Sequence, residues 1–221
     1  MGSEKYFVGS LHTSTKRNYL HRMNDDKVHC MEIAKLYAQD YWDGDRRYGY
    51  GGYKYIPGRW KKVAEDLIEH YELDNSSKIL DIGCGKGFLL YEIQLLLPKL
   101  EIYGCDISEY ALANLHPNLK GNFFNHPAQK VFNYPDNFFS LTISMATFHN
   151  LSLNELPIAL KELGRLGKKN YLMVESFRND LEFFNLECWA LTAQSLLSTE
   201  EWKWCFKHFG YSGDYEFIFF E

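Results

Sequence analysis

One short run of the sequence has the residue types of a loop that binds a small molecule. It reads Asp81-Ile-Gly-Cys-Gly-Lys-Gly87 and lies between an apolar stretch and a segment of helical periodicity. Glycines in such a loop leave backbone N–H groups open to a ligand. The dinucleotide-binding spacing is Gly-x-Gly-x-x-Gly, whereas this run has Gly-x-Gly-x-Gly after an aspartate. A carboxylate there repels a pyrophosphate and attracts a cation, such as the ammonium group of an amino acid.

A second carboxylate, Asp106, follows Gly87 by nineteen residues, at the end of the next predicted strand. A carboxylate at this position accepts hydrogen bonds from the hydroxyl groups of a ribose. The paired carboxylates and the glycines therefore predict a pocket for a nucleoside joined to a cationic amino acid, and S-adenosylmethionine is the ligand that we expect. The alternative, a tight turn that binds nothing, does not explain the paired carboxylates.

A histidine follows the predicted strand 139–145. Ligands of open parallel sheets bind beyond the carboxyl ends of the strands, so residues 146–150 should face the reacting group. His149 is the member of this segment that titrates near neutral pH, which makes it a candidate general base. The simpler alternative is a histidine that only forms hydrogen bonds at a strand end.

The segment 41–60 is rich in aromatic residues, arginine and glycine, and we interpret it as a long loop that covers the site. Its Tyr50 and Tyr53 join His149 as candidate catalytic residues that line the substrate pocket. The candidates for substrate binding are Arg46, Arg47 and Tyr48, because guanidinium groups match carboxylates and phosphates. The alternative is that the tyrosines pack the N-terminal helix onto the core and the arginines are solvated.

Helices and strands must alternate to bring these residues together. Trp60, Val63, Ala64, Leu67, Ile68 and Tyr71 form a helical stripe. Strands are expected at 79–82, 102–105, 122–125, 139–145 and 171–175, with helices from 86, 108 and 152 and, after the last strand, at 198–210; residues 215–221 alternate like a terminal strand. Such alternation predicts an α/β fold with a doubly wound, mostly parallel sheet and helices on both faces. We expect an N-terminal helix and lid segment at 1–58 and a cofactor-binding domain at 59–221.

Composition and charge narrow the function classes. The 221 residues are 46% hydrophobic and 24% charged, as in a globular protein with one core. The sequence has no apolar run long enough for a membrane span and no secretory signal, so we expect a cytoplasmic protein. Five scattered cysteines without a Cys-x-x-Cys pair argue against a metal site.

The net charge of −5 is unevenly distributed, because residues 1–62 hold twelve Lys/Arg against seven Asp/Glu. The acidic remainder argues against nucleic acid as a partner and favours a small-molecule substrate. The sequence is compatible with a homo-oligomer.

Over about residues 59–176, the chain resembles the class I S-adenosylmethionine-dependent methyltransferases. The resemblance rests on the runs 79–87, 106–108 and 139–151 and implies a Rossmann-like sheet. It implies that Asp81 and the glycines contact the methionine part, Asp106 the ribose and Ile107 the adenine. The expected cofactor-binding residues are Asp81, Gly83, Cys84, Gly85, Gly87, Asp106, Ile107, Asn125, His126 and Met145. Asn125 and His126 stand where the family often has an aspartate, and Ser140 where an acidic residue is common, so the adenine contact departs from the family pattern.

The resemblance implies methyl transfer to an oxygen or nitrogen of a small polar metabolite, anionic ones included. A weaker similarity, in Tyr41–Arg46 and Gly210–Tyr215, points to uncharacterised bacterial small-molecule methyltransferases of surface-polysaccharide or specialised-metabolite pathways. Two alternatives stay open: a cofactor-binding subunit without catalysis, and a methyltransferase that acts on a macromolecule. A nicotinamide oxidoreductase is disfavoured by the glycine spacing.

Overall fold

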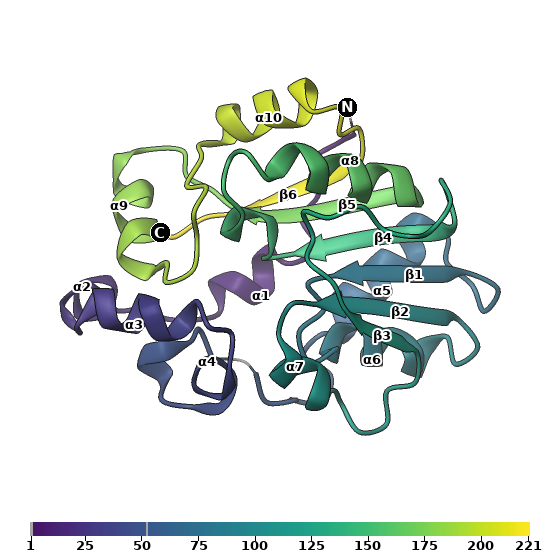
Figure 1. The fold of residues 1–221 in the computed structure, drawn as a ribbon, viewed down its shortest axis with the longest axis horizontal. Coiled ribbons are helices and arrows are strands. Elements are labelled where there is room, and N and C mark those ends of the chain that lie inside the picture. Colours follow the sequence, from purple (N-terminus) through teal and green to yellow (C-terminus); the bar gives the residue numbers. More distant parts are fainter. Residues whose placement is uncertain (1, 52) are drawn as a thin grey trace.

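The fold is an α/β sandwich around one parallel sheet (Figure 1). The computed structural model describes residues 2–51 and 53–221; Gly52, one of the glycines in the predicted loop, lies outside the described residues. The strands are β1 (Lys78–Ile82), β2 (Glu101–Asp106), β3 (Asn122–Asn125), β4 (Phe139–Met145), β5 (Gly167–Glu175) and β6 (Asp214–Ile218). Their order is β3-β2-β1-β4-β5-β6 and every pairing is parallel. The predicted α/β class and the Rossmann-like sheet are confirmed.

Helices cover both faces of the sheet. They are α5 (Lys61–Tyr71), α6 (Phe88–Leu96), α7 (Glu109–Ala113), α8 (Leu156–Leu166), α9 (Asp180–Trp189) and α10 (Thr199–His208). The N-terminal elements are α1 (Gly9–Thr13), α2 (Tyr19–Asn24), α3 (Lys27–Ala34), α4 (Gln39–Asp43) and the 3₁₀ turn η1 (Arg46–Tyr48); a second 3₁₀ turn, η2 (Phe148–Asn150), follows β4. Figure 1 shows α2, α3 and α4 gathered beyond the arrowheads of the strands, where the carboxyl ends of the sheet lie.

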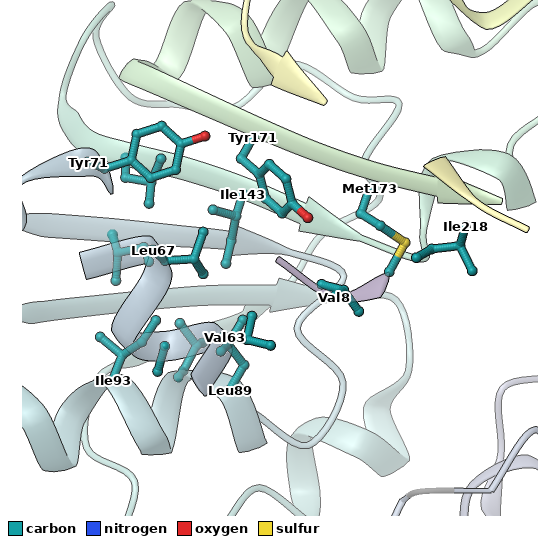
Figure 2. Close-up of a cluster of buried hydrophobic side chains, with 14 of the residues drawn as sticks. Val8, Val63, Leu67, Tyr71, Leu89, Ile93, Ile143, Tyr171, Met173 and Ile218 are labelled. Carbon is teal, nitrogen blue, oxygen red and sulfur yellow. The ribbon is translucent and has the colours of Figure 1, made fainter. Parts of the chain in front are cut away.

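Side chains of each strand alternate between two apolar cores. Ile79 and Ile143 face α5 and α6, where they pack with Leu67 (Figure 2). Leu80 faces the other side, in the core that includes Trp202 of α10. The two central strands, β1 and β4, are buried along nearly their whole length, as expected for a parallel sheet that is covered on both faces.

The N-terminus packs against the edge strand β6, which the sequence patterns do not predict. The backbone N–H of Lys5 donates to the carbonyl of Tyr215 at 2.8 Å, and Val8 enters the main core. The buried carboxylate of Glu216 accepts the N–H groups of Phe7, Val8 and Gly9 at 2.7 to 3.1 Å. Residues 3–12 therefore pack on the sheet, and α2, α3 and α4 form a cap.

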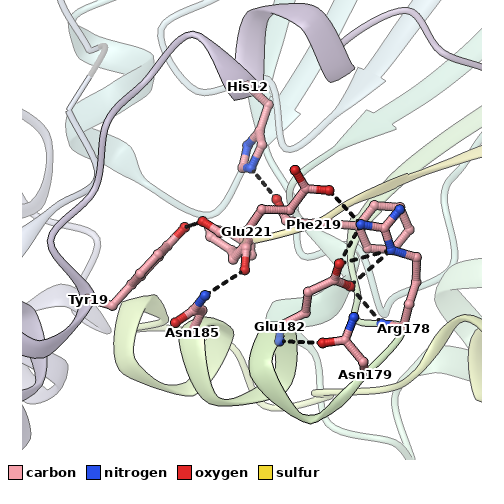
Figure 3. A network of polar contacts seen from close by, with 9 residues as sticks. His12, Tyr19, Arg178, Asn179, Glu182, Asn185, Phe219 and Glu221 are labelled. Carbon is pink, nitrogen blue, oxygen red and sulfur yellow. Dashed lines mark hydrogen bonds and ion pairs between the residues drawn. The ribbon is translucent and has the colours of Figure 1, made fainter.

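Residues 219–221 are held between the N-terminal segment and α9 (Figure 3). His12 Nε2 lies 2.8 Å from the carbonyl of Phe219, and the Tyr19 hydroxyl donates to the carbonyl of Glu221 at 3.0 Å. Asn185 of α9 donates to the carbonyl of Phe220 at 3.0 Å. These contacts fix the ring of Phe220 at the wall of the cavity described below.

Three local predictions differ from the structure. The segment predicted as a continuous loop contains α4 and η1, because the ring of Tyr41 is buried against the core and Asp45 caps η1 by accepting the N–H of Arg47 at 3.0 Å. The helix expected from residue 152 begins only at Leu156, although Ser152 and Glu155 are hydrogen-bonded to each other before it. The terminal strand ends at Ile218. The helix expected at 198–210 is α10, and Ser198 with Glu201 forms a capping box at its start.

Candidate functional site

A cavity of about 740 Å³ opens at the carboxyl ends of the strands. It lies between β1 and β4, where the strand order reverses, and its size is that of ordinary ligand sites. Strand ends and the loops after them form one wall, and the N-terminal cap forms another. No helix among residues 2–51 and 53–221 is long and apolar enough to cross a membrane.

The glycine loop after β1 is shaped so that only glycine fits. Gly83 has φ +87°, and a Cβ there would lie 1.9 Å from Oγ1 of Thr147. Gly85 has φ +54°, and its Cβ would lie 2.9 Å from the indole ring of Trp42. Gly87, at φ +71°, precedes α6, and its Cβ would collide with Leu119 at 2.4 Å. Gly83 and Gly85 line the cavity with Cys84, whereas Gly87 fixes the start of the helix behind it.

Asp106, at the end of β2, is anchored to the glycine loop. One carboxylate oxygen, Oδ2, accepts the N–H of Gly85 at 2.8 Å, and the other accepts the N–H of Ser108 at 2.8 Å. Burial raises the pKa of Asp106, and these hydrogen bonds oppose the rise. The side chain lines the cavity, so its remaining lone pairs are placed to accept hydrogen bonds from a ligand.

Asp81, at β1, is the carboxylate that a cationic ligand would satisfy. It is buried, it lines the cavity, and its Oδ1 has no hydrogen-bond partner among the described residues. Burial, and secondarily the charge of Asp106, raise the pKa of Asp81 to about 8. A buried carboxyl without donors is costly, and an ammonium group would supply both charge and hydrogen bonds. The residues present therefore fit a ligand that carries a cationic amino acid.

Some of the predicted adenine contacts line the cavity, and one instead holds the backbone next to it. Ile107, His126 and Met145 line the cavity, and Nδ1 of His126 is buried without a partner among the described residues. Asn125 instead donates from Nδ2 to the carbonyl of Ile107 at 2.9 Å. Asn125 thus holds the Ile107 backbone and is not among the described residues that line the cavity.

The cap lies directly on the glycine loop and on the segment after β2. The indole N–H of Trp42 donates to Oγ of Ser108 at 2.8 Å. Lys86 of the glycine loop forms an ion pair with Asp43 at 2.6 Å, and Asp43 also accepts the hydroxyl of Tyr110 at 2.9 Å. Since Lys86 is buried, this pair ties the cap to the loop. A ligand in the glycine loop is therefore enclosed by α4.

Tyr50 and Tyr53 line the cavity, as the sequence suggests for the substrate pocket. The Tyr50 hydroxyl accepts the N–H groups of Leu191 and Thr192, at 2.6 and 3.1 Å. Burial raises the pKa of Tyr50 to about 12 and raises that of Tyr53 as well. Both phenols therefore stay protonated at neutral pH, which favours a lining role over proton abstraction.

The two adjacent arginines of η1 point to different surroundings. Arg46 lines the cavity, and its guanidinium carbon lies 5.5 Å from the ring centre of Trp189. Arg47 forms an ion pair with Asp25 at 2.7 Å. Tyr48 packs edge-on to His29 with ring centres 6.0 Å apart. Of the three predicted substrate contacts, the structure brings Arg46 alone to the cavity.

His149, in η2, lines the cavity, but its basic ring nitrogen is engaged by the backbone. Nδ1 accepts the backbone N–H of Glu175 at 3.2 Å, and Nε2 lies 3.5 Å from a carboxylate oxygen of Glu175. Burial lowers the pKa of His149 to about 3. A ring that holds its basic nitrogen against a backbone donor is a poor general base.

Three residues of the site are not among the sequence-based candidates. Glu175 ends β5, and that position at the carboxyl end of a predicted strand was the available signal. Arg17 lies between two rings, with its guanidinium carbon 5.4 Å from the ring centre of Trp189 and 5.2 Å from that of Phe220. Trp42 lies in the aromatic segment 41–60 that the sequence predicts to cover the site, although it is not itself a predicted contact, whereas nothing in the local sequence around Arg17 marks that residue.

Known proteins with similar sequences and structures are methyltransferases. Residues 79–170 match a family described as "Methyltransferase domain". The chain is 28% identical over 180 residues to demethylmenaquinone methyltransferase of Thermotoga maritima, covering 78% of this chain and 75% of that protein. It is 32% identical over 107 residues to ribosomal RNA small subunit methyltransferase C of Klebsiella pneumoniae, covering 44% of this chain and 30% of that protein.

Among solved structures, the plantazolicin methyltransferase BpumL, in complex with a pentazolic desmethylPZN analog and SAH, has a similar fold. The TM-score is 0.57 at 21% identity, and the match covers 81% of this chain and 75% of that chain.

Proposed function

We propose that this chain is a class I S-adenosylmethionine-dependent methyltransferase, as the family match of residues 79–170 and the similarity to demethylmenaquinone methyltransferase support, and that its methyl acceptor is a small polar metabolite with an anionic group. The cofactor, when bound, supplies a methyl group on a positively charged sulfur. The transfer goes to an oxygen or a nitrogen of the acceptor. The protein's part is to align the two molecules, exclude water and manage the acceptor's proton.

The cofactor half of the cavity would be held by residues of the first two strands. Asp81 would pair with the ammonium group, since it is a buried carboxylate with an unpartnered oxygen. The backbone of Gly83 and Gly85 would lie against the methionine part, and Asp106 would accept the ribose hydroxyls. Ile107 would cover the adenine.

Three arginines, Arg17, Arg22 and Arg46, have their guanidinium groups beside the ring of Trp189, and the observation that carries the anionic acceptor is that Arg17 and Arg46 also line the cavity. The guanidinium carbons of Arg17 and Arg46 lie 5.4 and 5.5 Å from the same indole ring, and both residues line the cavity. Nε of Arg17 is buried without a hydrogen-bond partner among the described residues. A half-buried Arg17 and an exposed Arg46, both beside the ring of Trp189, are suited to a carboxylate or a phosphate.

Enclosure supports a small acceptor. We propose that α2, α3 and α4 of the N-terminal segment 1–58 act as the cap. Arg22 holds the cap together, since its guanidinium donates to the carbonyls of Arg46 and Gly49 at 3.0 and 2.7 Å. Lys27 also donates to the carbonyl of Cys188 at 2.8 Å, which ties α3 to the end of α9. A substrate enclosed in this way must fit in the same cavity of about 740 Å³ as the cofactor.

The first experiment is thermal unfolding with S-adenosylhomocysteine, with NAD as the parallel control. A ligand at a hundred times its Kd adds about 2.7 kcal/mol of stability. A shift with NAD alone would contradict the cofactor assignment.

The second experiment presents S-adenosylmethionine and a panel of small hydroxy and amino acids, their uncharged amides, and sugar phosphates. Arg46→Ala should raise KM for the preferred anion about tenfold, whereas the matched Arg47→Ala should leave it within about twofold, since a hydrogen bond to a charged group contributes about 1.5 kcal/mol or more. Preference for the uncharged amides, or equal effects of the two substitutions, would contradict an anionic acceptor.

A macromolecular acceptor is the second candidate. It is favoured by the positive net charge of residues 1–62 and by the similarity to a ribosomal RNA methyltransferase over 107 residues. Incubation with total RNA and labelled S-adenosylmethionine tests it directly. Label in RNA, with no turnover of the small-molecule panel, would replace the proposal above. No turnover of any acceptor would favour a cofactor-binding role.

A further inference from the structure

Glu175 presents an unpaired carboxylate to the cavity. It is the last residue of β5, and its side chain lines the cavity while remaining only 13% exposed. Its Oε2 is buried and has no hydrogen-bond partner among the described residues. The Glu175 backbone is fixed, since its carbonyl accepts the indole N–H of Trp202 at 3.1 Å. A carboxylate held in this way can accept a proton from a molecule in the cavity.

The neutral ring of His149 places an N–H group next to this carboxylate. Its Nδ1 accepts the backbone N–H of Glu175, so the neutral ring carries its own proton on Nε2. Nε2 lies 3.5 Å from Oε2 of Glu175. The backbone of His149 is fixed as well, because its carbonyl accepts the N–H groups of Gln194 and Ser195 at 2.9 and 3.0 Å. At this distance the N–H forms no hydrogen bond with Oε2, so the histidine limits the position of the carboxylate by contact and by the partial positive charge of its N–H, and it leaves the base role to the carboxylate.

We propose that Glu175 is the general base of the reaction, with His149 as its positioning residue, and that the acceptor atom is a hydroxyl oxygen or an amine nitrogen that still carries a proton. This inference rests on the proposed function above. A carboxylate or thioether nucleophile has no proton to lose and would leave Glu175 without a role. The acceptor is thus an alcohol, phenol or amine that also bears an anionic group for Arg17 and Arg46.

The proton and electron balance is complete with S-adenosylmethionine as the cofactor. The Glu175 carboxylate takes the proton of the acceptor's O–H or N–H group. The freed electron pair forms the bond to the methyl carbon, and the sulfur–methyl bond breaks with its electrons remaining on sulfur. The protonated Glu175 then releases its proton to solvent when the products leave, which restores the carboxylate.

The surroundings of Glu175 suit a base that works near neutral pH. Burial raises the pKa of Glu175 to about 7, and the positive charge of Arg17 opposes the rise. The other titratable and charged groups that face it are His149, Tyr50 and, near Arg17, Arg46. A base whose pKa lies close to the working pH is both largely ionised and strong enough to take a proton.

The first test needs no acceptor. Difference infrared spectroscopy of the complex with S-adenosylhomocysteine follows protonated carboxyl groups between pH 5 and pH 9. We expect a carboxyl that titrates near neutral pH in the wild type and is absent from Glu175→Gln. His149→Asn keeps an acceptor for the backbone N–H but removes the Nε2 proton, so the same carboxyl should titrate at higher pH. A spectrum unchanged by Glu175→Gln would overturn the inference.

The second test uses the best acceptor of the small-molecule panel. Glu175→Gln should lower kcat about a hundredfold or more, the usual contribution of a general base, while S-adenosylhomocysteine affinity stays within about twofold. The acidic limb of the kcat/KM profile should move to higher pH in His149→Asn, and Glu175→Asp should recover part of the activity. A Glu175→Gln enzyme with wild-type kcat would refute the base. Absence of S-adenosylhomocysteine binding to the wild type would instead refute the proposed function.

Discussion

Replacing Asp81 by asparagine should make the ligand-free protein more stable while weakening its cofactor binding. Burial raises the pKa of Asp81 from 3.8 to about 8, so the folded carboxyl holds a proton that the unfolded chain has released. A raised carboxyl pKa opposes folding, and this penalty grows as the pH rises from about 4 to about 8. The penalty at pH 7 is about 4 kcal/mol, because pH 7 lies about three units above the unfolded pKa and still below the folded one.

Asparagine keeps the size of the side chain and removes its titration. Asp81→Asn should therefore raise the free energy of unfolding at pH 8 by up to about 5 kcal/mol and change it little at pH 4. The variant should also lose about 1.5 to 3 kcal/mol of affinity for S-adenosylhomocysteine, the value of a hydrogen bond to a charged group. Urea unfolding at pH 4 and pH 8 without ligand measures the first effect, and calorimetric titration with S-adenosylhomocysteine measures the second.

Glu216→Gln is the matched control, because Glu216 is a buried carboxylate outside the cavity. Its oxygens accept three backbone N–H groups and the hydroxyl of Tyr171 at 2.6 Å. Its amide replacement would set an NH₂ group against those donors and should destabilise the protein. If Asp81→Asn destabilises the protein at pH 8 as Glu216→Gln does, or binds S-adenosylhomocysteine like the wild type, then Asp81 is not the unpaired carboxylate of the cofactor site.

Three further predictions concern the backbone and the cap. Gly83→Ala should reduce stability by more than Gly58→Ala, as measured by urea unfolding, because both have positive φ but only the Gly83 position has atoms within 4 Å of an added Cβ. Ala146→Gly should raise the melting temperature, since Ala146 has φ +55° and the left-handed region costs a non-glycine residue about 1 kcal/mol; an unchanged or lower value would contradict strain there. Asp43→Ala should speed dissociation of S-adenosylhomocysteine severalfold in stopped flow, because the ion pair with Lys86 that holds the cap is lost; an unchanged rate would show that the cap opens without breaking this pair.

The sheet and the cofactor half of the site follow from local sequence. The strand before Asp81 and the helix after Gly87 each have their own periodicity, and parallel strands place their last residues at one edge of the sheet. Asp81 and Asp106 could therefore be placed before any tertiary contact was known. Their spacing also predicts the class of ligand, because the glycine loop and the two carboxylates contact a ligand from the ends of neighbouring strands.

The acceptor half depends on contacts between distant segments, and sequence patterns carry little of that information. Arg46 and Arg47 are chemically identical neighbours, and only the turn at η1 directs one to the cavity and the other to Asp25. Arg17 reaches the site because residues 3–12 pack along β6. His149 and Glu175 meet because β4 and β5 are paired, with Met145 opposite Met173.

Hydrogen-bond satisfaction separates the carboxylates of the site from those of the scaffold. Glu92 and Glu216 are buried, and each is met by donors: Glu92 accepts the hydroxyl of Tyr55 at 2.8 Å, and Glu216 accepts backbone N–H groups. Among the residues that the structure describes, Asp81 and Glu175 are the carboxylates that keep a buried oxygen without any donor. A buried hydrogen-bond acceptor without a donor lowers the stability of the protein unless a ligand supplies the missing hydrogen bond. The two unsatisfied carboxylates line one cavity, so the same cofactor and acceptor that the enzyme binds would relieve both.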